Sequence, residues 1–200
     1  MTEKQSQGRS NPGLHSAIVL SLVLCLLVFV ADVLTRDRIR HNRQMSALGI
    51  IEEVMPLDYD NALYQDWVDI DSLSTRVYRA RKDGNKVGVV FMPVTSKGYN
   101  AEIRAAVGVR YDGSLAAVRI IEQHETPGLG DQVHQRKSNW IQGFRDHSLA
   151  NTPSAAWAVK TENGNFDAIS GATISPRAVI NSVREVLQYY QSHRDELYEN

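Results

Sequence analysis

A long charge-free run near the N-terminus limits this chain more than any other feature. No Asp, Glu, Lys or Arg occurs between Asn11 and Ala31, and residues 17–30 are almost purely apolar. About 20 such residues let a helix cross a bilayer, where unpaired backbone groups find no partner. The run therefore predicts one membrane-spanning helix over residues 16–35, in contact with membrane lipid, after a polar tail over residues 1–15.

A cleaved signal peptide is the alternative interpretation of the same run. No small-x-small cleavage site follows it, and Phe29 fits such a site badly, which favours an uncleaved anchor. Lys4 and Arg9 precede the run, and a cluster of arginines follows it: Arg36, Arg38, Arg40 and Arg43. The positive-inside rule alone would therefore place the C-terminal side in the cytoplasm.

The composition excludes several classes of protein. The 200 residues include 22 basic and 23 acidic side chains, for a net charge of −1, and no basic stripe points to nucleic acid. Cys25 is the only cysteine, so no intrachain disulfide forms and no cysteine cluster predicts zinc or iron–sulfur. Any redox chemistry would therefore need an organic cofactor.

The rest of the chain predicts an α+β fold. Residues 36–56 predict a linker helix with an apolar stripe at Met45, Leu48, Ile51 and Met55, ended by Pro56. Four β-like runs then follow, at residues 74–80, 86–94, 102–111 and 115–122. Turn signals at Asp83-Gly84 and Asp112-Gly113 suggest hairpins and a largely antiparallel sheet with flanking helices.

The domain that contains these strands is expected to span residues 57–190. Residues 131–144 predict helical or irregular structure with Trp140, Ile141 and Phe144 turned inward. The C-terminal residues 191–200 are strongly polar and are expected to fray.

Residues 167–179 predict a short strand, a glycine turn and the start of a helix. Ser175 is suited to the N-cap and Pro176 to the first helical position. Apolar residues then recur at helical spacing, at Val179, Val183, Val186, Leu187 and Tyr190. Thr173 would lie just ahead of a helix N-terminus, which suits a phosphate. A plain turn and cap is the alternative for so short a motif.

A second stretch, His124-Glu125-Thr126-Pro127-Gly128-Leu129-Gly130-Asp131, predicts a loop with unusual backbone angles. A surface turn is one interpretation, and a ligand clamp is the other, because polar groups and glycines are dense here. A metal cluster of His124, Glu125, Asp131 and His134 is disfavoured, because Pro127 and the glycines break any helix between them.

Together the two stretches resemble the FMN-binding domain family, and within it the G subunits of Rnf-type ion-translocating oxidoreductase complexes. The resemblance extends to residues 157–160, 165–167 and 61–63. In that family the last Thr of Ser/Thr-Gly-Ala-Thr carries FMN through a phosphoester bond. The matching residue is Thr173, with Ser170 in the variable first place.

The resemblance implies roles for the residues of both stretches. Ser170, Gly171, Ala172 and the helix start would hold the FMN phosphate. The loop residues Thr126, Gly128, Leu129 and Gly130 would lie against the ring or the ribityl chain. Glu125 and Lys160 are candidate polar contacts, although Lys160 also fits a solvated surface charge.

The resemblance also implies how the flavin is attached. Thr173 would attack the FMN phosphorus of FAD, and AMP would leave. Because a Thr hydroxyl is a poor nucleophile, a separate flavin transferase that uses FAD and Mg²⁺ is expected as the maturation partner. The bound flavin supplies the electron chemistry, so no catalytic residue and no resident metal are assigned to this chain.

The implied function is a membrane-anchored, electron-transferring subunit without turnover of its own. Its partners would be the other membrane and redox subunits of the complex, and nucleic acid is not among them. The resemblance places the flavin domain on the periplasmic side of a bacterial inner membrane, against the arginine count. We adopt this orientation, because the charge rule is statistical and partner subunits can fix topology.

Three alternatives stay open at this point. One is the equivalent FMN subunit of a sodium-translocating NADH:quinone reductase, although those subunits tend to be longer. Another is a membrane-anchored flavin-binding sensor or regulatory module. The last is an anchored adaptor without a cofactor.

Overall fold

The computed structural model describes residues 20–30, 32, 34–35, 49–56, 58–70 and 75–199. The chain divides into two units, residues 1–46 and 47–200. In the first unit residues 20–30 are helical, and their apolar side chains are exposed. Within the described residues, no helix combines the length and apolarity that a membrane crossing needs. The predicted span lies partly outside these residues and stays a prediction.

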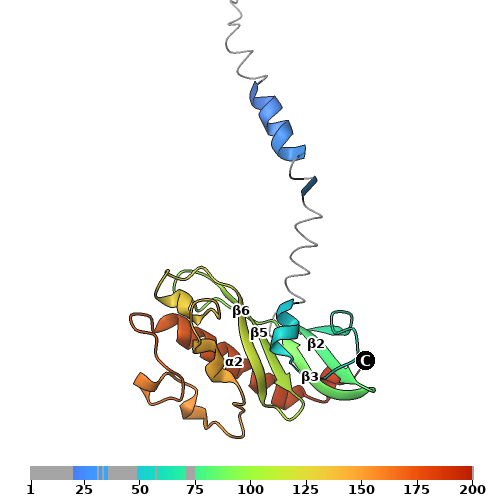
Figure 1. The fold of residues 1–200 in the computed structure, drawn as a ribbon, viewed down its shortest axis with the longest axis vertical. Coiled ribbons are helices and arrows are strands. Elements are labelled where there is room, and N and C mark those ends of the chain that lie inside the picture. Colours follow the sequence, from blue (N-terminus) through green and yellow to red (C-terminus); the bar gives the residue numbers. More distant parts are fainter. Residues whose placement is uncertain are drawn as a thin grey trace, which may run out of the picture. The chain divides into compact units, whose positions relative to one another are not determined.

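An antiparallel sheet forms the framework of the second unit (Figure 1). Its strands are β1 (Trp67–Ile70), β2 (Thr75–Lys82), β3 (Asn85–Phe91), β4 (Val94–Thr95), β5 (Ile103–Arg110) and β6 (Leu115–Glu122). Their order is β1-β2-β3-β5-β4, and β6 pairs with the other side of β5. The predicted α+β class with an antiparallel sheet is confirmed, whereas the short β1 and a separate β4 were not predicted.

Both predicted hairpins form. Asp83 and Gly84 have φ of 50° and 77°, and Lys82 pairs with Asn85 across them. Two consecutive positive φ angles are typical of the type I′ turn, whose twist matches that of the strands. In the second hairpin Gly113 has φ of 87°, between β5 and β6.

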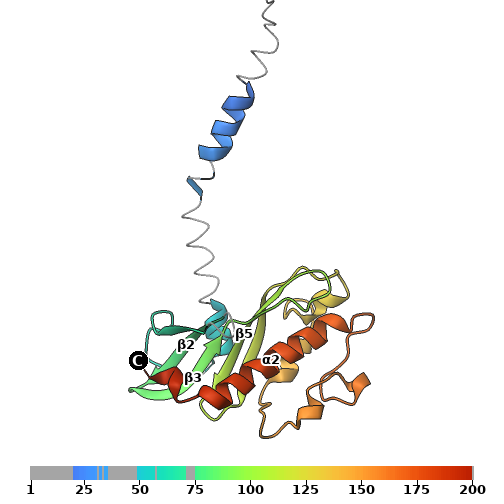
Figure 2. The ribbon, with the colours of Figure 1, turned by 180° about the vertical axis from the view of Figure 1, so that it is seen from behind.

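The sheet is covered on both faces. The helix α2 (Ile174–His193) packs on one face (Figure 2), where Val107 and Val109 of β5 meet Val183 and Leu187 in the larger core cluster. A smaller cluster on the other face holds Ile51, Val54, Met55, Leu63, Ala80, Val90, Ala106 and Ala117. Residues 49–54 are helical, so this end of the predicted linker is part of the folded unit. Met45 and Leu48 lie outside the described residues.

The segment between β6 and α2 contains short 3₁₀ turns and two isolated β-bridges, and aromatic rings supply its core. The turns are η2 (Gly130–Val133), η3 (Trp140–Phe144), η4 (Ser154–Ala156) and η5 (Lys160–Glu162). Phe144 stacks on Phe166 with centroids 4.5 Å apart, and Trp157 lies 5.4 Å from Phe166. Ile141 and Phe144 are buried and Trp140 packs against them, as predicted.

The start and the end of α2 differ from the prediction. The helix begins at Ile174, so Ser175 is not its N-cap and Pro176 is its third residue. Proline is tolerated there because the first N–H groups of a helix have no intrahelical acceptor anyway. The expectation that the C-terminal residues fray is wrong: η6 (Glu196–Tyr198) packs back, and Leu197 and Tyr198 are buried in the core.

Gly108 of β5 gives a direct test of how closely residues 49–54 approach the sheet. A Cβ at Gly108 would lie 1.9 Å from the carbonyl oxygen of Val54. We expect Gly108→Ala to lower the free energy of unfolding by about 3 kcal/mol, because backbone must move. Gly143→Ala is the control, since nothing lies within 4 Å of its Cβ position. Chemical denaturation should show a change of less than about 0.5 kcal/mol for this control.

Candidate functional site

The two stretches that the sequence singled out meet at one cleft of about 340 Å³. η2 and the N-terminal end of α2 lie at the same end of the unit in both views (Figures 1 and 2). The lining residues are Tyr99, Glu125, Thr126, Leu129, Gly130, Gly171, Ala172, Thr173, Ile174 and Ser175. Segments that are far apart in the sequence therefore form a single site.

A tight turn presents Thr173 at the start of α2. The Ala172 N–H donates to the Ile169 carbonyl at 3.0 Å, and Gly171 has φ of 73°. A positive φ at the third position of a turn is typical of type II and favours glycine. Thr173 is exposed and makes no side-chain capping hydrogen bond. Its hydroxyl is therefore available to a ligand in the cleft.

The first turn of α2 offers two free backbone donors. The first hydrogen bond of the helix runs from the Arg177 N–H to the Thr173 carbonyl at 3.3 Å. The N–H groups of Ile174 and Ser175 therefore have no intrahelical acceptor, and Pro176 has no N–H. Aligned peptide dipoles also place partial positive charge here, so the helix start suits an anion.

Asp131 stabilises the second loop through hydrogen bonds to other residues of the same loop. The residue is 4% exposed, and its Oδ1 accepts a 2.7 Å hydrogen bond from the Gly128 N–H. Gly128 has φ of 76°, so the loop has the unusual backbone angle that its glycines predicted. The Asp131 N–H in turn donates to the Thr126 carbonyl at 3.3 Å. These bonds hold Thr126, Leu129 and Gly130 along one wall of the cleft.

Two glycines let the loop and the turn come into contact. A Cβ at Gly171 would lie 3.0 Å from Cδ2 of Leu129, and a Cβ at Gly130 would lie 2.5 Å from Oγ of Ser175. Both distances are too short for a side chain without a shift of its neighbour. The glycines of the two motifs therefore serve close packing as well as turn geometry.

Glu125 lies buried at the back of the cleft with 4% of its surface exposed. Its carboxylate accepts hydrogen bonds from the N–H groups of Tyr99 and Asn100, at 3.1 and 3.2 Å. It also accepts a short hydrogen bond from the hydroxyl of Ser175. Glu125 was expected as a polar contact to a cofactor, and the structure adds these three partners within the protein.

Three of the predicted site residues do not line the cleft. Gly128 and Ser170 are exposed beside it. Lys160 is also exposed, and its Nζ lies 2.5 Å from Oδ1 of Asp167. The interpretation of Lys160 as a ring contact therefore rests on the resemblance alone.

Tyr99 and Ile174 line the cleft but were missed as site residues. Tyr99 is 65% exposed, Ile174 41% and Leu129 39%, which gives the mouth of the cleft an apolar rim. Lys97-Gly98-Tyr99-Asn100 predicted only a turn, and an aromatic residue in such a turn was the available signal.

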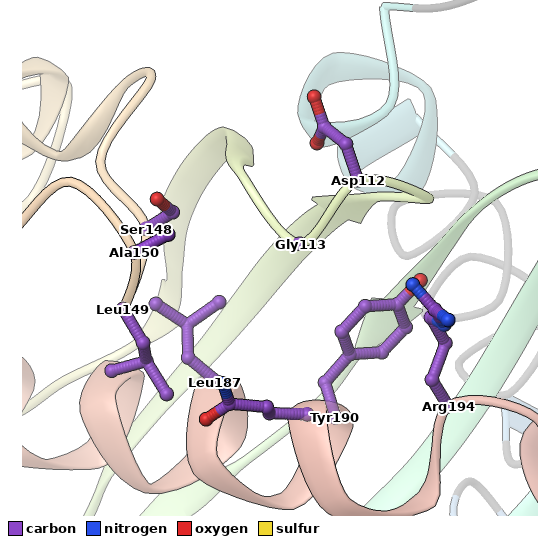
Figure 3. A pocket seen from close by; sticks show the side chains of 9 residues that line it. Asp112, Gly113, Ser148, Leu149, Ala150, Leu187, Tyr190 and Arg194 are labelled. Atoms are coloured by element: carbon purple, nitrogen blue, oxygen red, sulfur yellow. The ribbon is translucent and has the colours of Figure 1, made fainter.

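A second cavity, of about 310 Å³, lies toward the C-terminal end of α2 (Figure 3). Leu149 and Leu187 form its apolar part, and the Tyr190 hydroxyl lies beside Arg194 at the other end. That hydroxyl already donates to the Tyr111 carbonyl at 3.1 Å. Asp112 and Arg194 line it with charges of opposite sign, and the negative end of the helix dipole also lies here. The free N–H groups at the start of α2 therefore suit a phosphate better than this cavity does.

His134 follows the second loop, and its pKa is lowered. Partial burial is the main cause, and the positive charges of Arg136 and Lys137 add to it. Its Nδ1 accepts a 3.1 Å hydrogen bond from the Arg136 N–H. The neutral imidazole is therefore the form that the folded protein favours.

Comparison with known proteins agrees with this site. Residues 98–188 match the family model of the FMN-binding domain, which spans the cleft from Gly98 to α2. The chain is 35% identical to the G subunit of the ion-translocating oxidoreductase complex of Pseudoalteromonas atlantica, over 91% of this chain and 86% of the relative. This chain belongs to the family of these G subunits. The G subunit of Aliivibrio fischeri is 34% identical, over 91% of this chain and 92% of the relative.

A third G subunit, from Photorhabdus laumondii, is 35% identical over 90% of this chain and 89% of the relative. The resemblance inferred from the two stretches is therefore confirmed for nearly the whole chain. The similarity also covers the cleft residues on all of its walls, because the matched domain begins at Gly98 and ends within α2.

Two glycine variants can separate the energetic cost of crowding Leu129 from the cost of a strained backbone angle. Gly128 has a positive φ, but nothing lies near its Cβ position, so Gly128→Ala should lower the unfolding free energy by about 1 kcal/mol through backbone strain alone. Gly171→Ala should cost about 2 kcal/mol, because Leu129 must also move. Denaturation of both variants measures the difference. Equal costs, or no relief when Leu129→Ala is combined with Gly171→Ala, would contradict the contact.

His134 should make stability depend on pH in a defined direction. Because its pKa is lowered on folding, the unfolded chain binds the proton first, and stability falls as pH drops below about 6.5. His134→Gln should flatten this part of the profile between pH 7 and pH 5. Thermal unfolding at several pH values measures it, and an unchanged slope in the variant would refute the assignment.

Proposed function

We propose that this chain is a membrane-anchored subunit that carries FMN, bonded through a phosphoester to Thr173, and relays electrons within an ion-translocating oxidoreductase complex. Membership of the G-subunit family and the FMN-binding domain over residues 98–188 support this proposal. The observation that carries it is the position of Thr173. A hydroxyl without a capping role lies in a cleft at the start of a 20-residue helix.

The residues around Thr173 fit a phosphate ester. The free N–H groups of Ile174 and Ser175 and the positive end of the α2 dipole would stabilise the remaining negative charge. Gly171 and Ala172, with no side chain and a single methyl group, add little bulk between the turn and the cleft. The turn of residues 170–173 thus provides both the attachment atom and the electrostatic environment of the phosphate.

The rest of the cleft fits an aromatic ring system. Tyr99, Leu129 and Ile174 form an exposed apolar rim, which a bound ring would cover. Thr126 and the backbone of Gly130 offer hydrogen-bonding groups on the same wall. Bound FMN supplies transfer of one or two electrons, and the protein holds and orients it. Lys160 is kept as a more distant candidate contact.

Anchoring and assembly complete the proposal. The apolar run over residues 17–30 would hold the subunit in the inner membrane with the flavin domain on the periplasmic side. The other subunits of the complex would be its electron donors and acceptors. A flavin transferase would attach FMN from FAD with Mg²⁺, forming the bond from Thr173 oxygen to phosphorus and releasing AMP.

The other candidate functions have no specific observation in their favour. The three relatives described above are named as G subunits of ion-translocating oxidoreductase complexes, not as part of an NADH:quinone reductase. No described feature favours a sensor module, and an adaptor without a cofactor leaves the exposed apolar rim unexplained.

Thr173→Ala tests the attachment site. We expect this variant to lose all covalent flavin and to keep its fold, because the exposed side chain supports no packing or cap. The protein should be produced with a flavin transferase, denatured, and analysed by mass spectrometry of intact chains and peptides. Wild type should gain the mass of FMN minus water on the peptide that contains Thr173.

Ser170→Ala is the matched control, because Ser170 is an exposed hydroxyl in the same turn. It should keep full covalent labelling. Flavin that survives denaturation on Thr173→Ala would move the attachment to another residue. An unlabelled wild type would leave a noncovalent flavin module or a colourless adaptor as the better function.

A further inference from the structure

The carboxylate of Glu125 joins three separate segments around the cleft. It accepts hydrogen bonds from the Tyr99 and Asn100 N–H groups and from the Ser175 hydroxyl. Tyr99 and Asn100 belong to the loop before β5, Glu125 to the loop after β6, and Ser175 to the first turn of α2. One buried side chain therefore contacts every segment that lines the cleft.

The surroundings of Glu125 leave little room for any other arrangement. A Cβ at Gly98 would lie 2.8 Å from its Oε1, and a Cβ at Gly130 would lie 3.0 Å from its Oε2. A carboxylate accepts about four hydrogen bonds, and three of these are already made within the protein. Its partners thus fix its position, and few of its lone pairs are left for a cofactor.

We propose that Glu125 is a positioning residue, which holds the first turn of α2 through Ser175 and so sets the direction of Thr173 toward the cleft. Ser175 lies two residues after Thr173, so a fixed Ser175 limits the rotation of the turn that carries the attachment hydroxyl. The proposal rests on the proposed function of Thr173. It assigns Glu125 a role that acts through Ser175, instead of a contact to the flavin.

An amide cannot replace this carboxylate, although glutamine has the same shape. Oε2 accepts from Tyr99 and Ser175, and Oε1 accepts from Asn100. Whichever way the amide of a glutamine turns, its NH₂ group faces one of the two backbone N–H donors. One buried donor is then unpaired, so Glu125→Gln should weaken the hydrogen bonds that join the loop before β5, the loop after β6 and the start of α2.

The decisive comparison is Ser175→Ala with Ser182→Ala in the full-length chain. Both serines are buried on α2, at 1% and 7% exposure, and only Ser175 bonds to Glu125. The rate of covalent labelling should be measured with flavin transferase, FAD and Mg²⁺, per folded protein. Ser175→Ala should be labelled about tenfold more slowly, because it loses a hydrogen bond to a charged group. Ser182→Ala should match wild type.

Hydrogen exchange of the flavin-free proteins gives a readout that does not depend on labelling. In Ser175→Ala and Glu125→Gln, amides of residues 177–180, the first that are hydrogen-bonded within α2, should exchange about tenfold faster, while those of β3 and β5 keep their wild-type rates. The visible circular dichroism of flavin on Ser175→Ala should also change. The exchange of Glu125→Gln is informative only if this variant folds. The comparison of Ser175→Ala with Ser182→Ala tests the proposal without it.

Two results would overturn the proposal. One is equal labelling and equal exchange in Ser175→Ala and Ser182→Ala. The other is faster exchange throughout the sheet in Ser175→Ala, which would make the contact purely structural. An unlabelled wild type refutes the proposed function instead, and hydrogen exchange would still show whether Glu125 holds the helix start.

Discussion

The burial of one carboxylate is the constraint on which the site depends. A buried charged group is costly unless it is hydrogen-bonded, so Glu125 can lie at 4% exposure only where its donors surround it. Those donors come from the loop before β5 and from the start of α2. The segments must therefore meet at this point when the chain folds, and the cleft is the space left between them.

The sheet makes that meeting possible because it fixes where α2 runs. β5 is buried on both faces, and the core on one face includes Val179, Val183 and Leu187 of α2. Residues 49–54 cover the other face through the close approach at Gly108. Because the core fixes the axis of α2, the start of the helix lies beside the loop that follows β6.

The direction of α2 then decides which of two similar cavities suits an anionic ligand. The cleft at the N-terminal end has free N–H groups and an available Thr173 hydroxyl. The cavity at the C-terminal end has about the same volume, but its Tyr190 hydroxyl is already engaged and the helix dipole is negative there. The two cavities differ little in size, and what distinguishes them is the free N–H groups at the start of the helix.

The sequence by itself determined what depends on short stretches of chain. The turn at Asp83-Gly84, the apolar spacing of α2 and the motif with Thr173 all follow from local backbone and side-chain preferences. The tertiary structure alone decided what depends on distant partners. Ser175 was expected as a cap, yet it donates to Glu125, 50 residues away in the sequence. Tyr198 lies in a polar tail and is buried by the core. Such contacts form only when the sheet and α2 have brought remote segments together, and no local pattern encodes them.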